Sequence, residues 1–150
     1  MEIQEAFDLV VTPAASEWLH EECGDDDDIV DFFRFKSWKN IPSATIAKNY
    51  SALPFLSPKA FAFVLPAYLI WVLENYKTSA SPTVDTTIYN LTPFNKSENL
   101  DLFIESKYHL LTNNQKTAIL KWLLFLSKYG EERVDMKFVR KALGYWLTYQ

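Results

Sequence analysis

The sequence predicts an all-α protein, folded as a single compact domain of six or seven helices over residues 1–150. Apolar residues recur at helical spacing along most of the chain. Only three glycines occur, too few for a fold rich in tight hairpins. A length of 150 residues fits one ordinary domain, which buries roughly 70% of the surface of its unfolded chain.

The first third of the chain predicts four short helices. A first helix is indicated by apolar residues at i, i+3, i+4 and i+7, namely Ile3, Ala6, Phe7 and Val10. Thr12 and Pro13 are typical N-cap and first-turn residues, so a second helix is expected to run from there through Leu19 to Gly24. Two more are expected around residues 25–33 and 43–50.

Ser57 and Pro58 again form a cap and a first-turn proline, and they predict a central apolar helix over about residues 58–76. Its uncharged part, residues 60–73, covers about 21 Å against about 30 Å of bilayer hydrocarbon, so no membrane span is expected. Pro66 removes a backbone donor, and we expect a kink there. The residues expected to be buried against the second central helix are Phe61, Val64, Leu65, Tyr68, Leu69 and Val72.

Residues 77–99 are polar and contain two prolines, and they are predicted to form one long loop. Residues 84–91 alternate weakly, so a short strand is possible within this loop. After the loop, Ser97 is expected to cap a short helix that continues through Ile104.

Thr112 and Gln115 form a capping-box pattern, which predicts the second central helix over residues 113–129. This helix is apolar over most of its circumference, as a buried helix is. Gly130 is expected to end it, and a final helix is expected to begin near Glu132.

Charge is strongly segregated along the chain. The first 31 residues carry eleven acids and no Lys or Arg, whereas the remainder carries eight acids and fifteen bases, giving −11 and +7 within a net charge of −4. The acidic part either covers the basic remainder of the same domain, presents a negative patch to a basic partner, or serves solubility alone. The candidate partner-binding residues are Glu21, Glu22, Asp25, Asp26, Asp27, Asp28 and Asp31.

Patterns for metal binding and catalysis are weak. His20 and Cys23 are two ligands without a second pair, and the aspartates lack the interleaved glycine and closing Glu of a calcium loop. We therefore expect no metal and no cofactor. No G-x-S-x-G turn is present, so no catalytic residue is assigned. An enzyme of unrecognised type stays an alternative, for which a deep pocket lined by His109 and carboxylates would be the evidence.

A second alternative is a small regulatory module that binds nucleic acid. The last helix is expected to carry a basic stripe at i, i+4, i+7 and i+8, formed by Arg133, Lys137, Arg140 and Lys141. A solvated outer face predicts the same pattern, and the chain is acidic overall, so nucleic-acid binding is not the leading hypothesis.

Part of the chain follows a familiar pattern. Trp38 is followed by Ile41-Pro42, then by "LPFLSPKAFAFVLPAYLIWVL" and "LTNNQKTAILKWLLFL". From about Trp38 to Leu126 this order resembles a small bacterial family of unknown function. The resemblance implies a compact, mostly helical bacterial protein, and it supplies no catalytic residues. The acidic segment before Asp31 is not part of the pattern.

These observations favour a non-enzymatic binding protein, most concretely an immunity protein that neutralises a cognate basic toxin or effector. A single cysteine excludes an intramolecular disulfide, and the acidic N-terminal residues differ from a secretory signal, so a cytoplasmic location is expected. The sequence does not indicate an oligomeric state.

Overall fold

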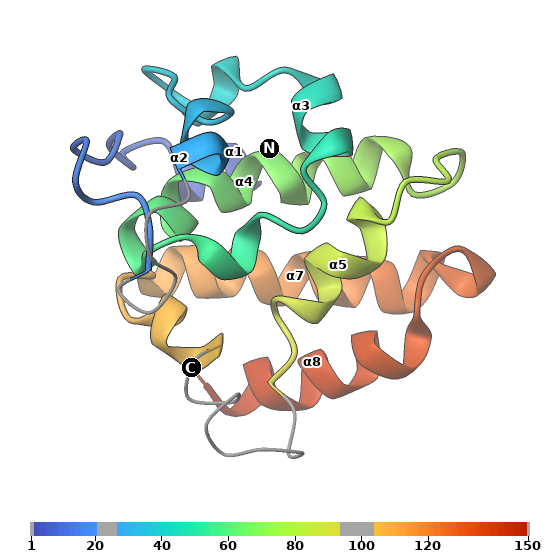
Figure 1. Ribbon diagram of the computed structural model, residues 1–150. Coiled ribbons are helices and arrows are strands. Elements are labelled where there is room, and N and C mark those ends of the chain that lie inside the picture. Colours follow the sequence, from blue (N-terminus) through green and yellow to red (C-terminus); the bar gives the residue numbers. More distant parts are fainter. Residues whose placement is uncertain (1, 21–26, 94–103, 150) are drawn as a thin grey trace.

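The computed structural model describes residues 2–20, 27–93 and 104–149, and over these residues the protein is helical without a β-sheet (Figure 1). The all-α prediction is confirmed. The α-helices are α1 (Glu2–Ala6), α2 (Asp27–Asp31), α3 (Ser43–Lys48), α4 (Pro58–Asn75), α5 (Thr83–Tyr89), α7 (Asn113–Tyr129) and α8 (Met136–Thr148). Short 3₁₀ segments are η2 (Trp38–Asn40), η3 (Leu53–Phe55), η4 (Ser106–Tyr108) and η5 (Glu131–Arg133).

Helix α4 is the centre of the core. The Ser57 hydroxyl accepts the Ala60 N–H at 3.1 Å, so the predicted cap is confirmed. The six side chains expected to be buried on this helix are all fully buried. The helix continues through Pro66 without a break, and the bend expected there stays a prediction. No helix in the described residues is long and apolar enough to cross a bilayer.

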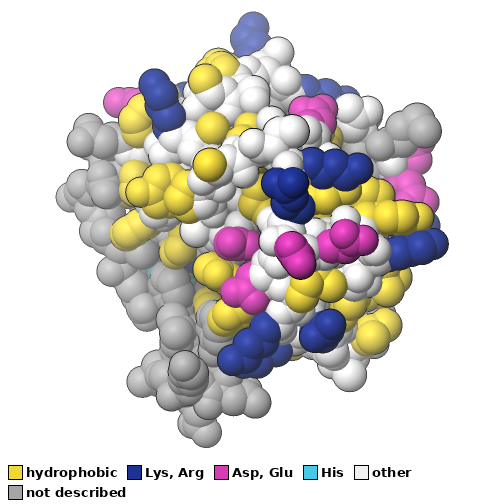
Figure 2. Space-filling model, turned by 90° about the vertical axis from the view of Figure 1, so that its right-hand side faces the viewer, with side chains coloured by type: hydrophobic (Ala, Val, Ile, Leu, Met, Phe, Trp, Pro, Cys, Tyr) yellow, Lys and Arg dark blue, Asp and Glu magenta, His cyan; other side chains and the backbone are white. Residues whose placement is uncertain are grey.

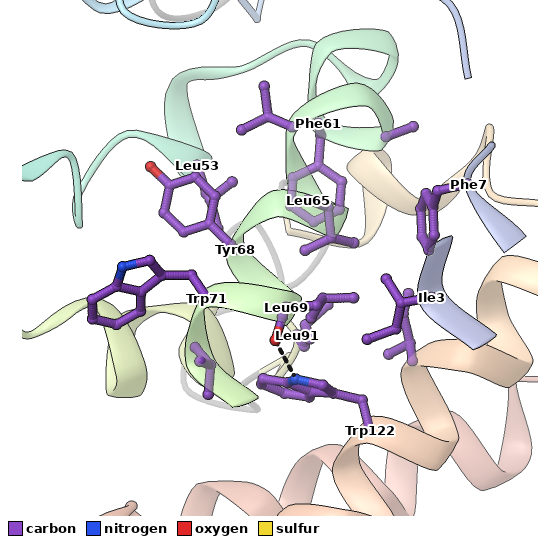
Figure 3. Packing of buried hydrophobic residues seen from close by; sticks show 14 of the residues in the cluster. Ile3, Phe7, Leu53, Phe61, Leu65, Tyr68, Leu69, Trp71, Leu91 and Trp122 are labelled. Atoms are coloured by element: carbon purple, nitrogen blue, oxygen red, sulfur yellow. Dashed lines mark hydrogen bonds between the residues drawn. The ribbon is translucent and has the colours of Figure 1, made fainter. Parts of the chain in front are cut away.

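The expected partner of α4 was partly wrong. Helix α4 packs chiefly against α5, η4, η2, α1 and α3, while α7 contacts α1 and α8. Helix α1 contacts both α4 and α7, and in Figure 3 Ile3 lies beside Leu65 and Leu69 of α4. The Trp122 indole N–H donates to the Leu69 carbonyl at 2.9 Å, which joins the two helices directly.

The long loop predicted over residues 77–99 contains helix α5, so both the loop and the short strand considered there were wrong. The loop was predicted because this stretch is rich in threonine, which is polar. Threonine can nevertheless be buried in a helix when its hydroxyl donates to a nearby carbonyl. Thr87 donates to the Thr83 carbonyl at 2.6 Å, and Thr83 donates to the Ile46 carbonyl at 3.1 Å. Both are fully buried, together with Val84 and Ile88 on the same face.

The helix predicted from Thr12 is not formed, since residues 15–18 make a turn and a bend and Leu19 pairs with Leu56 in an isolated antiparallel bridge. The Thr12 hydroxyl donates to the Phe35 and Lys36 carbonyls at 3.0 and 2.9 Å and does not cap a helix. The predicted stop at Gly24 and the cap at Ser97 lie outside the described residues.

The capping box of α7 is confirmed, with Thr112 and Gln115 each accepting the other's backbone N–H. Gly130 ends the helix as predicted. The last helix begins later than expected, at Met136, because Asp135 is its N-cap and Glu131 has a positive φ of 45° that interrupts the helical path.

Candidate partner-binding surface

The structure describes one end of the predicted acidic patch. Asp31 is the last residue of α2, and its side chain is 70% exposed. Asp27 and Asp28 begin the same helix, but only their backbone is described. Glu21, Glu22, Asp25 and Asp26 lie outside the described residues. Both flanks of the segment are anchored, because the backbone N–H of His20 donates to the Phe55 carbonyl at 2.8 Å and Phe33 is fully buried.

Ion pairing supports the interpretation that the acidic part covers the basic remainder. Each ion pair among the described residues joins an acid of the first 31 residues to a base beyond them. The pairs are Glu2–Lys121 at 2.7 Å, Asp8–Lys39 at 2.6 Å, Glu17–Lys59 at 2.8 Å and Asp31–Arg34 at 3.8 Å. Three of the four connect distant segments of sequence, so these charges help to hold the N-terminal residues on the domain.

The Glu17 pair is the best-bonded of the four. Its carboxylate accepts from Lys59 Nζ and from the Ala14 N–H at 3.0 Å. These donors, Lys59 first, hold the pKa of Glu17 below its usual value. The Ser57 hydroxyl also donates to the Glu17 carbonyl, and the Ser57 N–H donates to the Trp18 carbonyl at 2.8 Å. The chain is thus fixed on the start of α4 just before the acidic segment.

His20 and Lys107 lie next to this anchor. His20 Nε2 is 3.5 Å from the Ser106 hydroxyl, a contact at the limit of hydrogen bonding. Lys107 is buried and donates to the Leu56 carbonyl at 2.9 Å. Sequence reasoning missed these contacts, because Ser106 and Lys107 follow a weakly patterned stretch far from His20 in sequence.

No metal-binding cluster of three or more His, Cys, Asp or Glu side chains is found in the part of the chain that the structure describes. Cys23, considered with His20, lies outside that part. His109 is exposed in the turn that follows η4.

The basic stripe is shorter than predicted, because Arg133 belongs to η5 and not to the last helix. Lys137, Arg140 and Lys141 are exposed on α8. Figure 2 views the molecule from the side where α7 connects to α8, and acidic, basic and hydrophobic side chains are interspersed there without a continuous basic field.

Comparison with known proteins assigns the chain to a family. A family model described as a family of unknown function (DUF6714) matches residues 17–150. The chain belongs to the DUF6714 family. Neither the curated proteins nor the solved structures gave a match.

The DUF6714 match covers more of the chain than the pattern recognised between Trp38 and Leu126. It begins at Glu17, the residue that pairs with Lys59, and it extends through the last helix. The acidic segment therefore falls inside the range matched by the DUF6714 model, whereas the first helix and Asp8 precede it.

Proposed function

We propose that this DUF6714 protein binds a basic protein partner, and that it acts as an immunity protein that neutralises a bacterial toxin or effector in the cytoplasm. The observation that carries the proposal is the acidic segment of residues 21–31, which holds seven acids among eleven residues and no base. A negative surface of this density speeds association with a basic protein and selects it over acidic ones.

The contacts of the neighbouring acids support this assignment. Glu2, Asp8 and Glu17 pair with lysines of the helical body, and their charges are thereby used within the fold. Asp31 is the one acidic side chain of the segment that the structure describes; among the described residues it pairs with Arg34, three residues away, and it remains largely exposed. The residues on both sides of the segment are anchored, since His20 bonds to Phe55 and Phe33 is fully buried.

A toxin that acts on nucleic acid is a suitable partner by its chemistry. Such proteins carry Lys and Arg where they contact phosphates. A carboxylate-rich segment can occupy those positions, so the same charges that attract the toxin would also cover its substrate site.

The first test is growth rescue. Each protein encoded beside this gene is expressed in a bacterial host, with and without this chain, and growth is measured. We expect one neighbour to arrest growth and this chain to relieve the arrest. If no neighbour is toxic, or if the toxic one is unaffected by this chain, the immunity function is wrong.

The second test addresses the acidic segment. Association with the partner identified by growth rescue is measured by stopped flow. The D25N/D26N/D27N variant should associate more slowly, and its association rate should depend less on salt. The matched control is E5Q/E131Q/E132Q, which removes three exposed acids elsewhere and changes net charge equally. Equal association rates for the two variants would show that net charge, and not this segment, attracts the partner.

The nucleic-acid alternative rests on three exposed bases on one helix, Lys137, Arg140 and Lys141. Salt-dependent binding to a DNA or RNA duplex that is lost in R140E would favour it. An absence of binding at low salt would exclude it.

A further inference from the structure

We propose that residues 2–10 are a displaceable strap, and that the groove they occupy on the helical body binds an acidic amphipathic segment of a protein partner. Helix α1 contacts α4 and α7, and the Phe7 carbonyl accepts the indole N–H of Trp38 in η2. We call residues 2–10 the strap and the surface of α4, α7 and η2 beneath them the strap groove. This inference goes beyond the proposed function, because it does not use the acidic segment.

The strap makes few polar contacts with the helical body. Its backbone hydrogen bonds run between its own residues, as from Phe7 to Ile3 at 3.1 Å, and none joins it to the backbone of the rest of the described chain. The body contributes the 3.1 Å bond from the Trp38 indole and the ion pairs of Glu2 and Asp8. Both ion pairs are exposed, and exposed pairs stabilise a fold only weakly.

Two apolar side chains hold the strap in its groove. Ile3 and Phe7 are four residues apart, so they lie on the same side of the strap, and both are buried. Figure 3 shows Ile3 beside Leu65 and Leu69 of α4. Helix α1 has five residues, and a helix of that length is not stable on its own in water. The strap therefore owes its conformation to the strap groove.

The strap ends at an exposed link. Leu9 is 90% exposed and Val11 is 66% exposed, and the next residue, Thr12, is fixed by its bonds to two carbonyls. The strap can therefore leave its groove while the chain from Thr12 onward stays in place. The DUF6714 match begins at Glu17, so α4, α7 and η2 belong to the matched range and the strap precedes it.

The strap does not fill the groove. A cavity of about 200 Å³ lies between α1 and α7, where Ala6 faces Asn114 and Thr117. A second cavity of about 360 Å³ lies at the start of α1, and Leu73 of α4 and Phe125 of α7 supply apolar walls. Phe125 is partly exposed, so this apolar surface is open to solvent. A partner segment with bulkier side chains than the strap therefore has space in the strap groove.

The strap itself shows the chemistry that the groove accepts. Its apolar side chains are at i and i+4, and a carboxylate lies directly before the first and directly after the second. These carboxylates reach Lys121 at 2.7 Å and Lys39 at 2.6 Å, at two separate points of the groove. A short helix with an acid–apolar–three residues–apolar–acid pattern makes the same contacts, in the way that amphipathic helices bind apolar grooves.

The first test adds a strap in trans to the full chain. A fluorescein-labelled peptide of residues 2–10 is titrated with the protein, and its fluorescence anisotropy is followed. We expect saturable but weak binding, because the tethered strap competes at an effective concentration in the mM range. The E2Q/D8N variant of the chain should bind the peptide about fivefold more tightly, since both ion pairs of its own strap are removed.

Matched controls separate this effect from net charge. The chain variant E5Q/E131Q loses two exposed acids that form no ion pair among the described residues, and its affinity should equal that of the parent. A peptide carrying I3S/F7S should not bind. Absence of saturable binding, equal binding of the two peptides, or equal affinities of E2Q/D8N and E5Q/E131Q would each overturn the proposal.

The second test measures release of the strap in the unmodified chain by amide hydrogen exchange. The Phe7 amide should exchange roughly 100-fold faster than the Leu123 amide of α7, because local opening is more frequent than global unfolding. Equal rates would mean that the strap leaves only when the whole domain unfolds, which would overturn the proposal. Sedimentation is measured in parallel, because a dimer formed by exchange of straps would make a second copy, and not another protein, the ligand of the groove.

Discussion

Two glycines give opposite predictions for the same substitution. At Gly130, a Cβ atom would be 2.5 Å from the Leu126 carbonyl oxygen and 2.6 Å from Val134 Cγ2. The first of these atoms is backbone and cannot move without disturbing the end of α7. At Gly144, on the exposed face of α8, a Cβ atom would have no neighbour within 4 Å. Alanine is therefore crowded at one position and unobstructed at the other.

The magnitudes follow from these contacts. Gly130→Ala should lower the free energy of unfolding by about 1–3 kcal/mol, as overpacking of a well-filled site does. Gly144→Ala should raise it by about 0.5–1 kcal/mol, because alanine loses less backbone freedom than glycine on entering a helix. For a chain of this size each kcal/mol changes Tm by roughly 2–4 °C.

Urea and thermal unfolding followed by circular dichroism measure both effects. Each glycine variant is the control for the other, since the added methyl group is the same. A Gly130→Ala protein as stable as the parent would refute the packing described at the end of α7. A loss of stability in Gly144→Ala would refute the exposed position of that glycine.

Three other substitutions test single contacts. Trp122→Phe keeps a ring but leaves the Leu69 carbonyl without its indole donor, and should cost about 1–3 kcal/mol in urea unfolding. Thr112→Ala removes the cap of α7 and should cost about 1 kcal/mol in the same assay. Burial, followed by the hydrogen bond to Asp135, raises the pKa of Tyr89 from 10.0 to about 12. The stabilisation linked to this neutral phenol is present below pH 10 and lost as pH rises through about 12, so Tyr89→Phe should reduce the loss of stability over that window.

The outcomes that contradict these predictions are distinct. Trp122→Phe at parental stability would mean that the Leu69 carbonyl finds another donor. Thr112→Ala without effect, compared with the exposed Thr148→Ala, would mean that the cap is not needed. An unchanged alkaline unfolding profile in Tyr89→Phe would show that Tyr89 does not contribute to the titration.

The central helices were predictable because their signals are local. Ser57 before Pro58 and Thr112 before Gln115 are caps that act within one turn. Each cap is followed by an apolar stretch that is long enough to form a buried helix. Helix α5 was missed because its buried threonines resemble a loop by composition. Their hydroxyls bond to carbonyls of α5 itself and of α3, and only the second of these contacts depends on the fold.

Other features depend on residues distant in sequence. Residues 13–19 carry helix-start signals, yet Leu19 pairs with Leu56 and Thr12 bonds to two carbonyls more than twenty residues away. Charge segregation was visible in the sequence, but the identity of each ion pair was not.

The acidic side chains of the first 31 residues form two kinds of ion pair, which differ in how far apart the partners lie in sequence. The pairs of Glu2, Asp8 and Glu17 span 119, 31 and 42 residues, so each one fastens the N-terminal segment to the helical body. Asp31 pairs within three residues and fastens nothing distant. Seven acids within residues 21–31 repel one another, and a basic partner would relieve that repulsion. This electrostatic cost, together with the local range of the described ion pair of Asp31, is consistent with the partner binding that we propose.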